Sequence, residues 1–303
     1  MKMIIDTDPG VDDALAIALA CVMDEIELIG LTTVFGNTYV EQSARNARYM
    51  LDMLTHKAPV AKGAAFALGR DSHDPSDYVH GPEGFGALTD IPQIGLDDPR
   101  SAAQFLVDAA AEHKGELVIC PIGPLTNIAL ALELDPNFAA NVKDVILMGG
   151  AYQHAGNITP HAEANIYNDA AAADAVFASD LNVTMVGLDA TMQTLLTWDD
   201  FVQMGEDAPR VGGFIRDISD FYLRFYRSIG IEGGCAMHDS MAVLVAAFPE
   251  RFTFEDSGLQ VILEGDELGR TCADPSRKKT RIAMGVDTSW AVPYVKSEIA
   301  RLS

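Results

Sequence analysis

The sequence has little positive charge and few cysteines. Its 303 residues include 21 Lys and Arg against 44 Asp and Glu, which gives a formal net charge of −23. A surface this acidic repels phosphate backbones and anionic lipid headgroups, so neither nucleic acid nor a membrane surface is an expected partner. The four cysteines lie far apart and form no Cys-x-x-Cys pair, which excludes a zinc knuckle and a redox motif. We interpret them as buried free thiols.

Long hydrophobic runs are also absent. The longest apolar run near the N-terminus, residues 14–23, is too short to span a bilayer. Asp6 comes too early in the chain for the apolar region of a signal peptide. No repeat, low-complexity tract or Pro/Ser-rich linker divides the chain. With 49% hydrophobic residues and a mean hydropathy of +0.10, the sequence predicts a cytoplasmic globular protein with a sizeable core.

Short β-like runs alternate with helical patterns along most of the chain. The β-like runs contain Ile, Val or Leu at nearly every position, which is typical of strands covered on both faces of a parallel sheet. The predicted strands span residues 2–7, 26–33, 116–120, 142–148 and 182–187. The helical patterns span residues 11–23, 41–54, 101–112, 125–134 and 169–178. This alternation predicts an α/β fold with an open, mostly parallel, Rossmann-like sheet and helices on both faces.

The remaining segments differ in character. Residues 70–85 are polar and rich in Gly and Pro, which predicts a long mobile loop of the kind that covers a binding site. Residues 198–226 are helical and aromatic in pattern, and a glycine-rich turn follows them. The last predicted elements are a helix at 238–248, strands at 258–264 and 280–286, and a helix at 289–302.

Four carboxylates lie within eight residues at the end of the first predicted strand. Residues 6–13 read Asp-Thr-Asp-Pro-Gly-Val-Asp-Asp. In open α/β sheets this strand-to-helix turn is where ligands bind. One or two acids can serve as caps for the following helix, but four would repel one another unless they share a cation. Because a set of oxygen ligands suits calcium or magnesium, the run favours a metal site over capping alone.

Two other interpretations of this run fit poorly. An EF-hand loop that begins at Asp6 has Val11 where Gly is needed and Ile17 where Glu is needed. A phosphatase with an aspartyl nucleophile, Asp6 or Asp8, also begins with Asp-x-Asp after its first strand. The phosphatase motif continues with small or hydroxylated residues after the second Asp, and the sequence from Pro9 onward does not contain them.

Several further motifs follow predicted strands. They are the turn at 33–37, the Pro- and Gly-containing junction at 120–127, the segment 147–150, the amide- and acid-rich stretch 156–165, and the pair 238–239. Amide and carboxylate groups clustered after a strand can bind vicinal hydroxyls, because they donate and accept hydrogen bonds together. Two histidines, His80 and His238, can exchange protons near neutral pH if their pKa values are ordinary. Singly, each motif is equally explained as a turn or a polar loop.

Together the motifs resemble the nucleoside hydrolase family of the inosine–uridine type. The run at 6–13 is highly specific for that family, and the other motifs occur in its order at compatible spacings, from Asp6 to at least Asp239. The resemblance implies hydrolysis of the N-glycosidic bond of ribonucleosides for nucleoside salvage, one calcium ion per subunit, and a homodimer or homotetramer. Asp8 and Asp239 would share one metal although 231 residues (239 − 8) separate them. Residues 1–303 are therefore expected to form a single domain.

The resemblance also implies roles for individual residues. The calcium ligands would be Asp8, Asp13, the Ile122 carbonyl and Asp239. The catalytic residues would be Asp12, which deprotonates the attacking water, and His238, the acid for the leaving base. Asp6 would orient the metal cluster. The substrate-binding residues would be Asn37, His80, Met148, Asn157, Glu163, Asn165 and Asp239, with His80 near the base and Met148 lining the sugar pocket.

Alternatives remain open at this point. One is a metal-dependent phosphatase with an aspartyl nucleophile. Another is a non-catalytic, calcium-stabilised protein that binds ribose or nucleosides, which the presence of Asp12 argues against. The rings of the helical stretch 214–226 can stack on a base, but a core helix explains them equally well. The sequence leaves the preferred base open, and it does not decide whether His80 or His238 protonates the leaving group.

Overall fold

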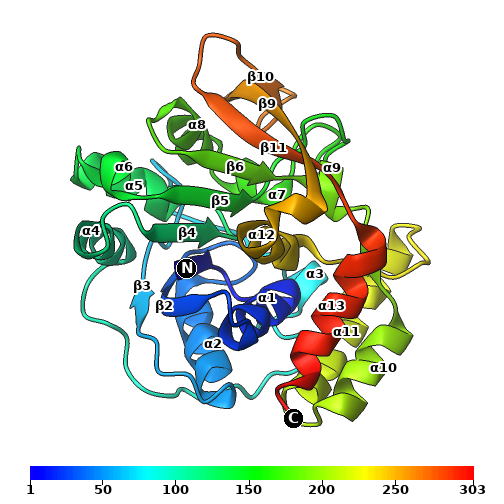
Figure 1. The fold of residues 1–303 in the computed structure, drawn as a ribbon. Helices are drawn as coiled ribbons and strands as arrows, with labels where there is room; N and C mark the ends of the chain where they lie inside the picture. The colour runs from blue at the N-terminus through cyan, green and yellow to red at the C-terminus, as the bar shows by residue number, and fades with distance from the viewer.

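A nine-stranded sheet forms the centre of the protein in the computed structural model, which describes all residues 1–303 (Figure 1). The strand order is β10-β9-β11-β6-β5-β4-β1-β2-β3. The strands are β1 Lys2–Thr7, β2 Glu27–Thr33, β3 Val60–Lys62, β4 Leu117–Pro121, β5 Asp144–Met148, β6 Val183–Val186, β9 Phe252–Val261, β10 Thr271–Ala273 and β11 Lys279–Val286. In the part of the sheet ordered β11-β6-β5-β4-β1-β2-β3, every neighbouring pair is parallel. Strand β9 pairs antiparallel with both β11 and β10. The predicted α/β fold with a mostly parallel open sheet is confirmed.

Helices cover both faces of the sheet, as the two-sided burial of the strands requires. They are α1 Val11–Val22, α2 Val40–Met53, α3 Asp77–His80, α4 Ala102–Glu112, α5 Thr126–Leu134, α6 Phe138–Asn141, α7 Ala164–Asn168, α8 Ala170–Ala178, α9 Leu188–Thr191, α10 Trp198–Asp207, α11 Val211–Ser228, α12 His238–Ala247 and α13 Thr288–Ala300. Met3 and Ile5 of β1 pack into a core with α1, α2, α11, α12 and α13. Ile4 packs into the opposite core with α4, α5 and α8. Alternate side chains of a strand point to opposite faces, so each face receives half of the apolar run.

Most predicted elements agree with the structure to within two residues. The strand expected at 258–264 is instead β9, Phe252–Val261, and the helical stretch expected at 198–226 consists of two helices, α10 and α11. The edge strands β3 and β10 have only three residues each and leave no sequence pattern. A separate two-stranded sheet, β7 Leu195–Leu196 with β8 Cys235–Ala236, is also too short to leave a sequence pattern. None of the helices combines the length and apolar composition that a bilayer-spanning segment requires.

The segment expected to be a loop at 70–85 contains a helix. Helix α3 occupies residues 77–80 and ends at Gly81, whose φ of 84° suits glycine. Figure 1 shows α3 near α1 and the C-terminal helices, at the edge where the strands end. A single helical turn is too short for helical periodicity to appear in sequence. The prediction of a loop is therefore wrong for these four residues, and His80 at the end of α3 is buried.

The carboxyl ends of the central strands meet at one edge of the sheet. In β1, Asp6 is level with Thr32 of β2 and with Pro121 of β4. Met148, the last residue of β5, is level with Val186 of β6. Since parallel strands end together, the residues that follow them in sequence are brought side by side although they are far apart along the chain.

Candidate active site

A cavity of about 360 Å³ lies at this edge of the sheet. The residues that line it include the sequence-predicted residues Asp12, Asn37, His80, Ile122, Met148, Asn157, Glu163, Asn165, His238 and Asp239. Asp8 and Asp13 are fully buried and lie outside the lining. The remaining wall is mostly apolar and includes Tyr78, Val79, Leu188, Met192, Phe225, Ile229 and Ile231. The cavity therefore combines a polar side with an apolar side.

Three carboxylates converge at the polar side. One oxygen from each of Asp12, Asp13 and Asp239 lies within 4.8 Å of the others. Asp12 and Asp13 stand in the first turn of α1, and Asp239 stands in the first turn of α12. The two helices pack against each other, and the positive ends of their dipoles favour negative charge at this point. Together the three side chains form a group that can bind a metal ion.

Asp8 lies next to this group, although it does not belong to the triplet. Its Oδ2 accepts the backbone N–H of Asn37 at 2.6 Å, and its Oδ1 is buried without a partner. A Cβ at Gly123 would lie 2.5 Å from that Oδ1, so the glycine leaves just enough room for the carboxylate. The pKa of Asp8 is raised well above its usual value, first by burial and then by the charge of Asp13.

Burial raises the pKa values of these carboxylates first, repulsion between them adds to it at Asp8, Asp13 and Asp239, and no Lys or Arg lines the cavity to offset it. Burial raises the pKa of Asp12 to about 6. The pKa of Asp13 is also raised to about 6, by burial and then by Asp12. Burial and the charges of Asp12, Asp13 and Asp8 raise the pKa of Asp239 well above its usual value. A divalent cation would remove this repulsion, so the all-oxygen donor set and the unpartnered oxygen of Asp8 fit a calcium ion.

Asp13 is held rigidly by three donors. Thr7 Oγ1 donates to Asp13 Oδ1 at 2.5 Å, and the Gly10 N–H donates to Oδ2 at 2.9 Å. The side-chain amide of Asn37 donates to the same Oδ2 at 3.1 Å. Asn37 was expected to bind ribose. In the structure it lines the cavity and also orients two carboxylates, since its backbone N–H bonds Asp8.

Asp6 lies deeper, below the cavity. Its Oδ1 accepts the Thr32 hydroxyl at 2.6 Å and the Asn127 side-chain amide at 2.8 Å, while its Oδ2 is buried without a partner. Burial raises its pKa to about 6, although both hydrogen bonds lower it. Asn127 ties this carboxylate to the end of β2, because the same amide donates to the Thr33 carbonyl at 2.9 Å.

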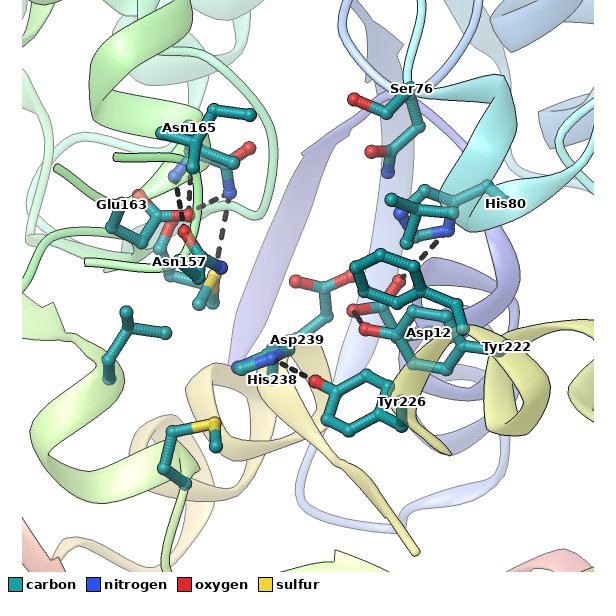
Figure 2. A pocket seen from close by; sticks show the side chains of 18 of the residues that line it. Asp12, Ser76, His80, Asn157, Glu163, Asn165, Tyr222, Tyr226, His238 and Asp239 are labelled. Carbon is teal, nitrogen blue, oxygen red and sulfur yellow. Dashed lines mark hydrogen bonds and ion pairs between the residues drawn. The ribbon is translucent and has the colours of Figure 1, made fainter. Parts of the chain in front are cut away.

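Three of the expected ribose-binding residues, Asn157, Glu163 and Asn165, lie together on one wall of the cavity (Figure 2). Glu163 begins α7 and accepts the N–H groups of Gly150, Asn165 and Ile166 at 2.9–3.1 Å. The Asn165 amide donates to the carbonyls of Ile122 and Met148. The oxygen of Asn157 accepts the N–H of Ala164 at 3.0 Å. These amides and carboxylates are thus fixed before any substrate enters.

His238 lies between two hydroxyl groups. Its Nδ1 is 2.8 Å from Thr191 Oγ1, and its Nε2 is 2.7 Å from the hydroxyl of Tyr226. Burial, together with the nearby rings of His80 and His154, lowers its pKa to about 3. The acid role that the resemblance implies for His238 requires an ordinary pKa. The structure instead makes it a neutral imidazole, with one nitrogen donating and the other accepting.

His80 lies beside Asp12 on one side of the cavity, across from Asn157, Glu163 and Asn165 (Figure 2). Its Nδ1 accepts the backbone N–H of Val11 at 3.2 Å and lies 3.7 Å from Asp12 Oδ1. Burial lowers its pKa to about 4, so at neutral pH the ring is uncharged and its contact with Asp12 is not an ion pair. The ring stacks on Tyr222, with centroids 5.2 Å apart.

Three residues beside the carboxylates and histidines, Tyr222, Tyr226 and Thr191, make contacts that the sequence did not reveal. Tyr222, one of the rings expected at most to stack on a base, donates its hydroxyl to Asp12 Oδ2 at 3.2 Å. Tyr222 and Tyr226 are four residues apart on α11, and this spacing places both on one helical face. Thr191, the partner of His238, left no signal in the sequence, because a single Thr in a short helix is common in any fold.

The family model described as inosine-uridine preferring nucleoside hydrolase matches residues 3–292. The chain belongs to this family. As a nucleoside hydrolase, it is an N-glycosidase that cleaves ribonucleosides.

Similar proteins align with the hydrolase over nearly its whole length. Uridine nucleosidase 1 of Arabidopsis thaliana is 36% identical, with 99% of this chain and 93% of that protein aligned. The inosine-uridine preferring nucleoside hydrolase of Leishmania major is 38% identical, with 94% and 93% aligned. The structure of a purine-preferring ribonucleoside hydrolase from Gardnerella vaginalis superimposes with a TM-score of 0.96 at 38% identity, covering 100% of this chain and 99% of that one.

Proposed function

We propose that the enzyme hydrolyses ribonucleosides to free nucleobase and ribose in a calcium-dependent reaction. One observation carries the proposal: the oxygens of Asp12, Asp13 and Asp239 converge within 4.8 Å beside a cavity of about 360 Å³. The cavity has amide and carboxylate groups for a sugar on one side and apolar side chains for a flat base on the other.

The proposed calcium ligands are Asp8, Asp13, Asp239 and the carbonyl of Ile122. Three features support them: the donors are all oxygen, the Asp8 Oδ1 has no protein partner, and the carboxylates have raised pKa values in the absence of a cation. When bound, calcium supplies positive charge that acidifies water and holds two vicinal hydroxyls of ribose. We therefore expect 2′-deoxynucleosides to be poor substrates.

Asp12 is the proposed general base. It is more exposed than Asp13, and its Oδ1 has no hydrogen-bond partner. The Tyr222 hydroxyl on its other oxygen fixes the orientation of the carboxylate. A carboxylate with a raised pKa takes a proton from water more readily than an ordinary Asp does. Asp12 is thus suited to remove the proton of the attacking water.

The sugar wall stabilises the transition state in this proposal. Breaking the bond between ribose and base gives the sugar oxocarbenium character, and nearby carboxylates stabilise that positive charge. Glu163 and Asn165 are held in place by backbone groups of β5 and α7. Together with Asn157 they would bind the ribose hydroxyls with little rearrangement, which lowers the entropic cost of reaching the transition state.

His238 and Tyr226 are proposed to help the base leave. Because His238 is neutral, it cannot act as an imidazolium acid at neutral pH. It can still accept or donate one hydrogen bond at each nitrogen, so Thr191 and His238 would hold the Tyr226 hydroxyl for donation to the departing base. The proton that Tyr226 gives up would be replaced from solvent, to which Asp12 returns the proton taken from the attacking water. His80, which stacks on Tyr222 beside Tyr226, would contact the bound nucleoside near the base.

The test is a panel of purine and pyrimidine ribonucleosides assayed for free ribose, with and without prior removal of metal. We expect ribose release that stops after chelation and returns with calcium, and about one calcium per chain by elemental analysis after gentle purification. Full activity after exhaustive chelation, or zinc in the protein, would contradict the calcium site. Phosphate release from phosphomonoesters without base release would favour a phosphatase, and tight ribose binding without turnover would favour a binding protein.

A homodimer or homotetramer is proposed from the family resemblance. Sedimentation equilibrium at several protein concentrations tests it directly. A single species with the mass of one chain, 32.5 kDa, at all concentrations would contradict it.

A further inference from the structure

A buried carboxylate outside the catalytic group holds one wall of the cavity. Asp189, in the short helix α9, is 8% exposed. Its Oδ2 accepts the backbone N–H of Tyr152 at 2.8 Å, and its Oδ1 accepts those of Gln153 at 2.6 Å and His154 at 2.9 Å. Three successive N–H groups on one carboxylate form charge-assisted hydrogen bonds. Asp189 therefore fixes the backbone of the segment 151–154, which follows β5.

The side chain of His154 contrasts with this fixed backbone. It is exposed and lines the cavity. Its Nδ1 lies 2.7 Å from the Ala155 carbonyl. Since a carbonyl only accepts, Nδ1 carries a proton, and in the uncharged imidazole this leaves Nε2 as a hydrogen-bond acceptor; Nε2 has no protein partner. His80 and His238 are both buried, and each already bonds a protein group. His154 is thus the one cavity histidine whose free nitrogen reaches solvent.

The surroundings of His154 match a nucleobase better than a sugar. The ring is near enough to His238 to lower the pKa of that residue. Helix α9, whose Thr191 bonds His238, begins at Leu188 and is followed by Met192, and both apolar side chains line the cavity. The polar atoms of His238 and Tyr226 already bond each other. A nucleobase bound on this side of the cavity would have apolar contacts on its ring faces. Nε2 of His154 would then be available to accept a hydrogen bond from the edge of the base.

We propose that His154 hydrogen-bonds the nucleobase through Nε2 and that Asp189 is the positioning residue that holds it there. The inference rests on the proposed function, because it assumes a nucleoside in this cavity. An acceptor that faces N1 of a purine or N3 of a pyrimidine bonds the ring N–H of hypoxanthine and uracil. In adenine and cytosine it meets a second acceptor, because their amino donors lie one position further along the edge of the base. His154 is then a residue that determines base specificity.

The first experiment compares His154→Ala with the parent enzyme on inosine, uridine, adenosine, cytidine and nitrophenyl riboside. Loss of one hydrogen bond should lower kcat/KM for inosine and uridine about five- to tenfold. Values for adenosine, cytidine and nitrophenyl riboside should change less than about twofold. His161→Ala is the matched control. His161 also lies between β5 and α7, but it is outside the cavity lining, and its Nδ1 is 3.8 Å from Glu267 Oε1. The control variant should leave all five values unchanged.

Two results would overturn the inference. An equal loss on nitrophenyl riboside would place the contact of His154 on the sugar, and no loss on any substrate would remove the contact altogether. Both results require a parent enzyme that releases ribose. If the parent releases none from any nucleoside, the proposed function fails instead, so the two failures are distinguishable.

The second experiment tests the positioning role of Asp189. Asp189→Asn keeps the shape of the side chain but places an N–H₂ group against backbone N–H groups that now bond a carboxylate. The variant should show the same substrate pattern as His154→Ala: a loss on inosine and uridine, with nitrophenyl riboside spared. The double variant should lose no more than either single one, because both changes remove the same contact. Additive losses, or a loss on nitrophenyl riboside in a folded variant, would contradict the role.

Discussion

At the residue scale, the site depends on carboxylates that have no cationic partner. Asp6, Asp8 and Asp12 each have one oxygen buried without a hydrogen bond. Hydroxyl, amide and backbone N–H groups satisfy the rest. An unpaired buried charge is costly, and a protein keeps such groups when a ligand uses them. The two kinds of role proposed for them, metal binding and proton transfer, can be separated by single substitutions.

Asp12→Ala should lower kcat by about 10²–10⁴-fold, the usual effect of removing a general base. Bound calcium should remain near one per chain, because Asp8, Asp13 and Asp239 are proposed to hold it. Steady-state kinetics and elemental analysis on the same preparation make the comparison. Asp13→Ala is the contrasting variant and should lose both activity and metal. Loss of calcium in Asp12→Ala would instead make Asp12 a ligand, in line with its closeness to Asp13 and Asp239.

His238→Ala should lower kcat on natural nucleosides and spare nitrophenyl riboside, whose leaving group departs without a proton. Tyr226→Phe should reproduce this pattern, because it removes only the hydroxyl that bonds His238 Nε2. The measurement is kcat for each variant on inosine, uridine and nitrophenyl riboside. Equal losses on all three would mean that the pair positions the substrate and takes no part in proton transfer.

At the scale of elements, the site forms where strand ends and helix starts coincide. The acids of α1 and α12 come from the first turns of two helices that pack together. The turns after β2 and β4 bring Gly36 and Gly123 against Asp8. Side chains larger than hydrogen would displace that carboxylate. The glycines are therefore part of the metal site although they offer no ligand.

Gly123→Ala should weaken calcium binding at least about tenfold, because the new Cβ would lie 2.5 Å from Asp8 Oδ1 and 2.9 Å from Val34. Isothermal titration with calcium on metal-free protein measures the change. Gly213→Ala is the control: this glycine lies in α11, nothing lies within 4 Å of an added Cβ, and alanine stabilises a helix by about 0.5–1 kcal/mol. Its calcium affinity should not change. Normal affinity in Gly123→Ala would exclude Asp8 from the site.

At the scale of the whole molecule, the acidic cluster links stability to pH and to calcium. Asp6, Asp12 and Asp13 have folded-state pKa values of about 6, above the unfolded value of about 3.9. The metal-free fold thus binds more protons than the unfolded chain. The contribution of these three carboxylates to the stability of the metal-free fold is therefore highest below about pH 4, and it is lost as the pH rises through about 6. Calcium, which needs ionised carboxylates, should offset that decrease.

The unfolding temperature of the metal-free protein, relative to that of the calcium-loaded protein, should therefore decrease when the pH is raised from about 5 to about 7. Calorimetry at both pH values with and without calcium measures this difference. The difference should be larger at the higher pH. A difference that is the same at both pH values, or smaller at the higher one, would contradict the assignment of calcium to these carboxylates.

The fold class and the location of the acids follow from local sequence patterns. Strands such as β1 and β4 are apolar at nearly every position, and only a sheet covered on both faces buries them completely. The carboxylates of residues 6–13 are neighbours in sequence, so their position after β1 places them at the ligand-binding edge of any parallel sheet. These features are local, and they were predicted correctly for that reason.

The protonation of the histidines and the hydrogen bonds that support the cavity walls depend on tertiary contacts. His238 is neutral because Thr191, Tyr226 and the surrounding core come together around it from α9 and α11. His80 is buried because α3 packs against α11. Asp189 reaches the segment after β5 from 35 residues further along the chain. Hydrogen-bond partners and burial set a pKa, and both depend on which distant elements meet, which a linear pattern does not contain.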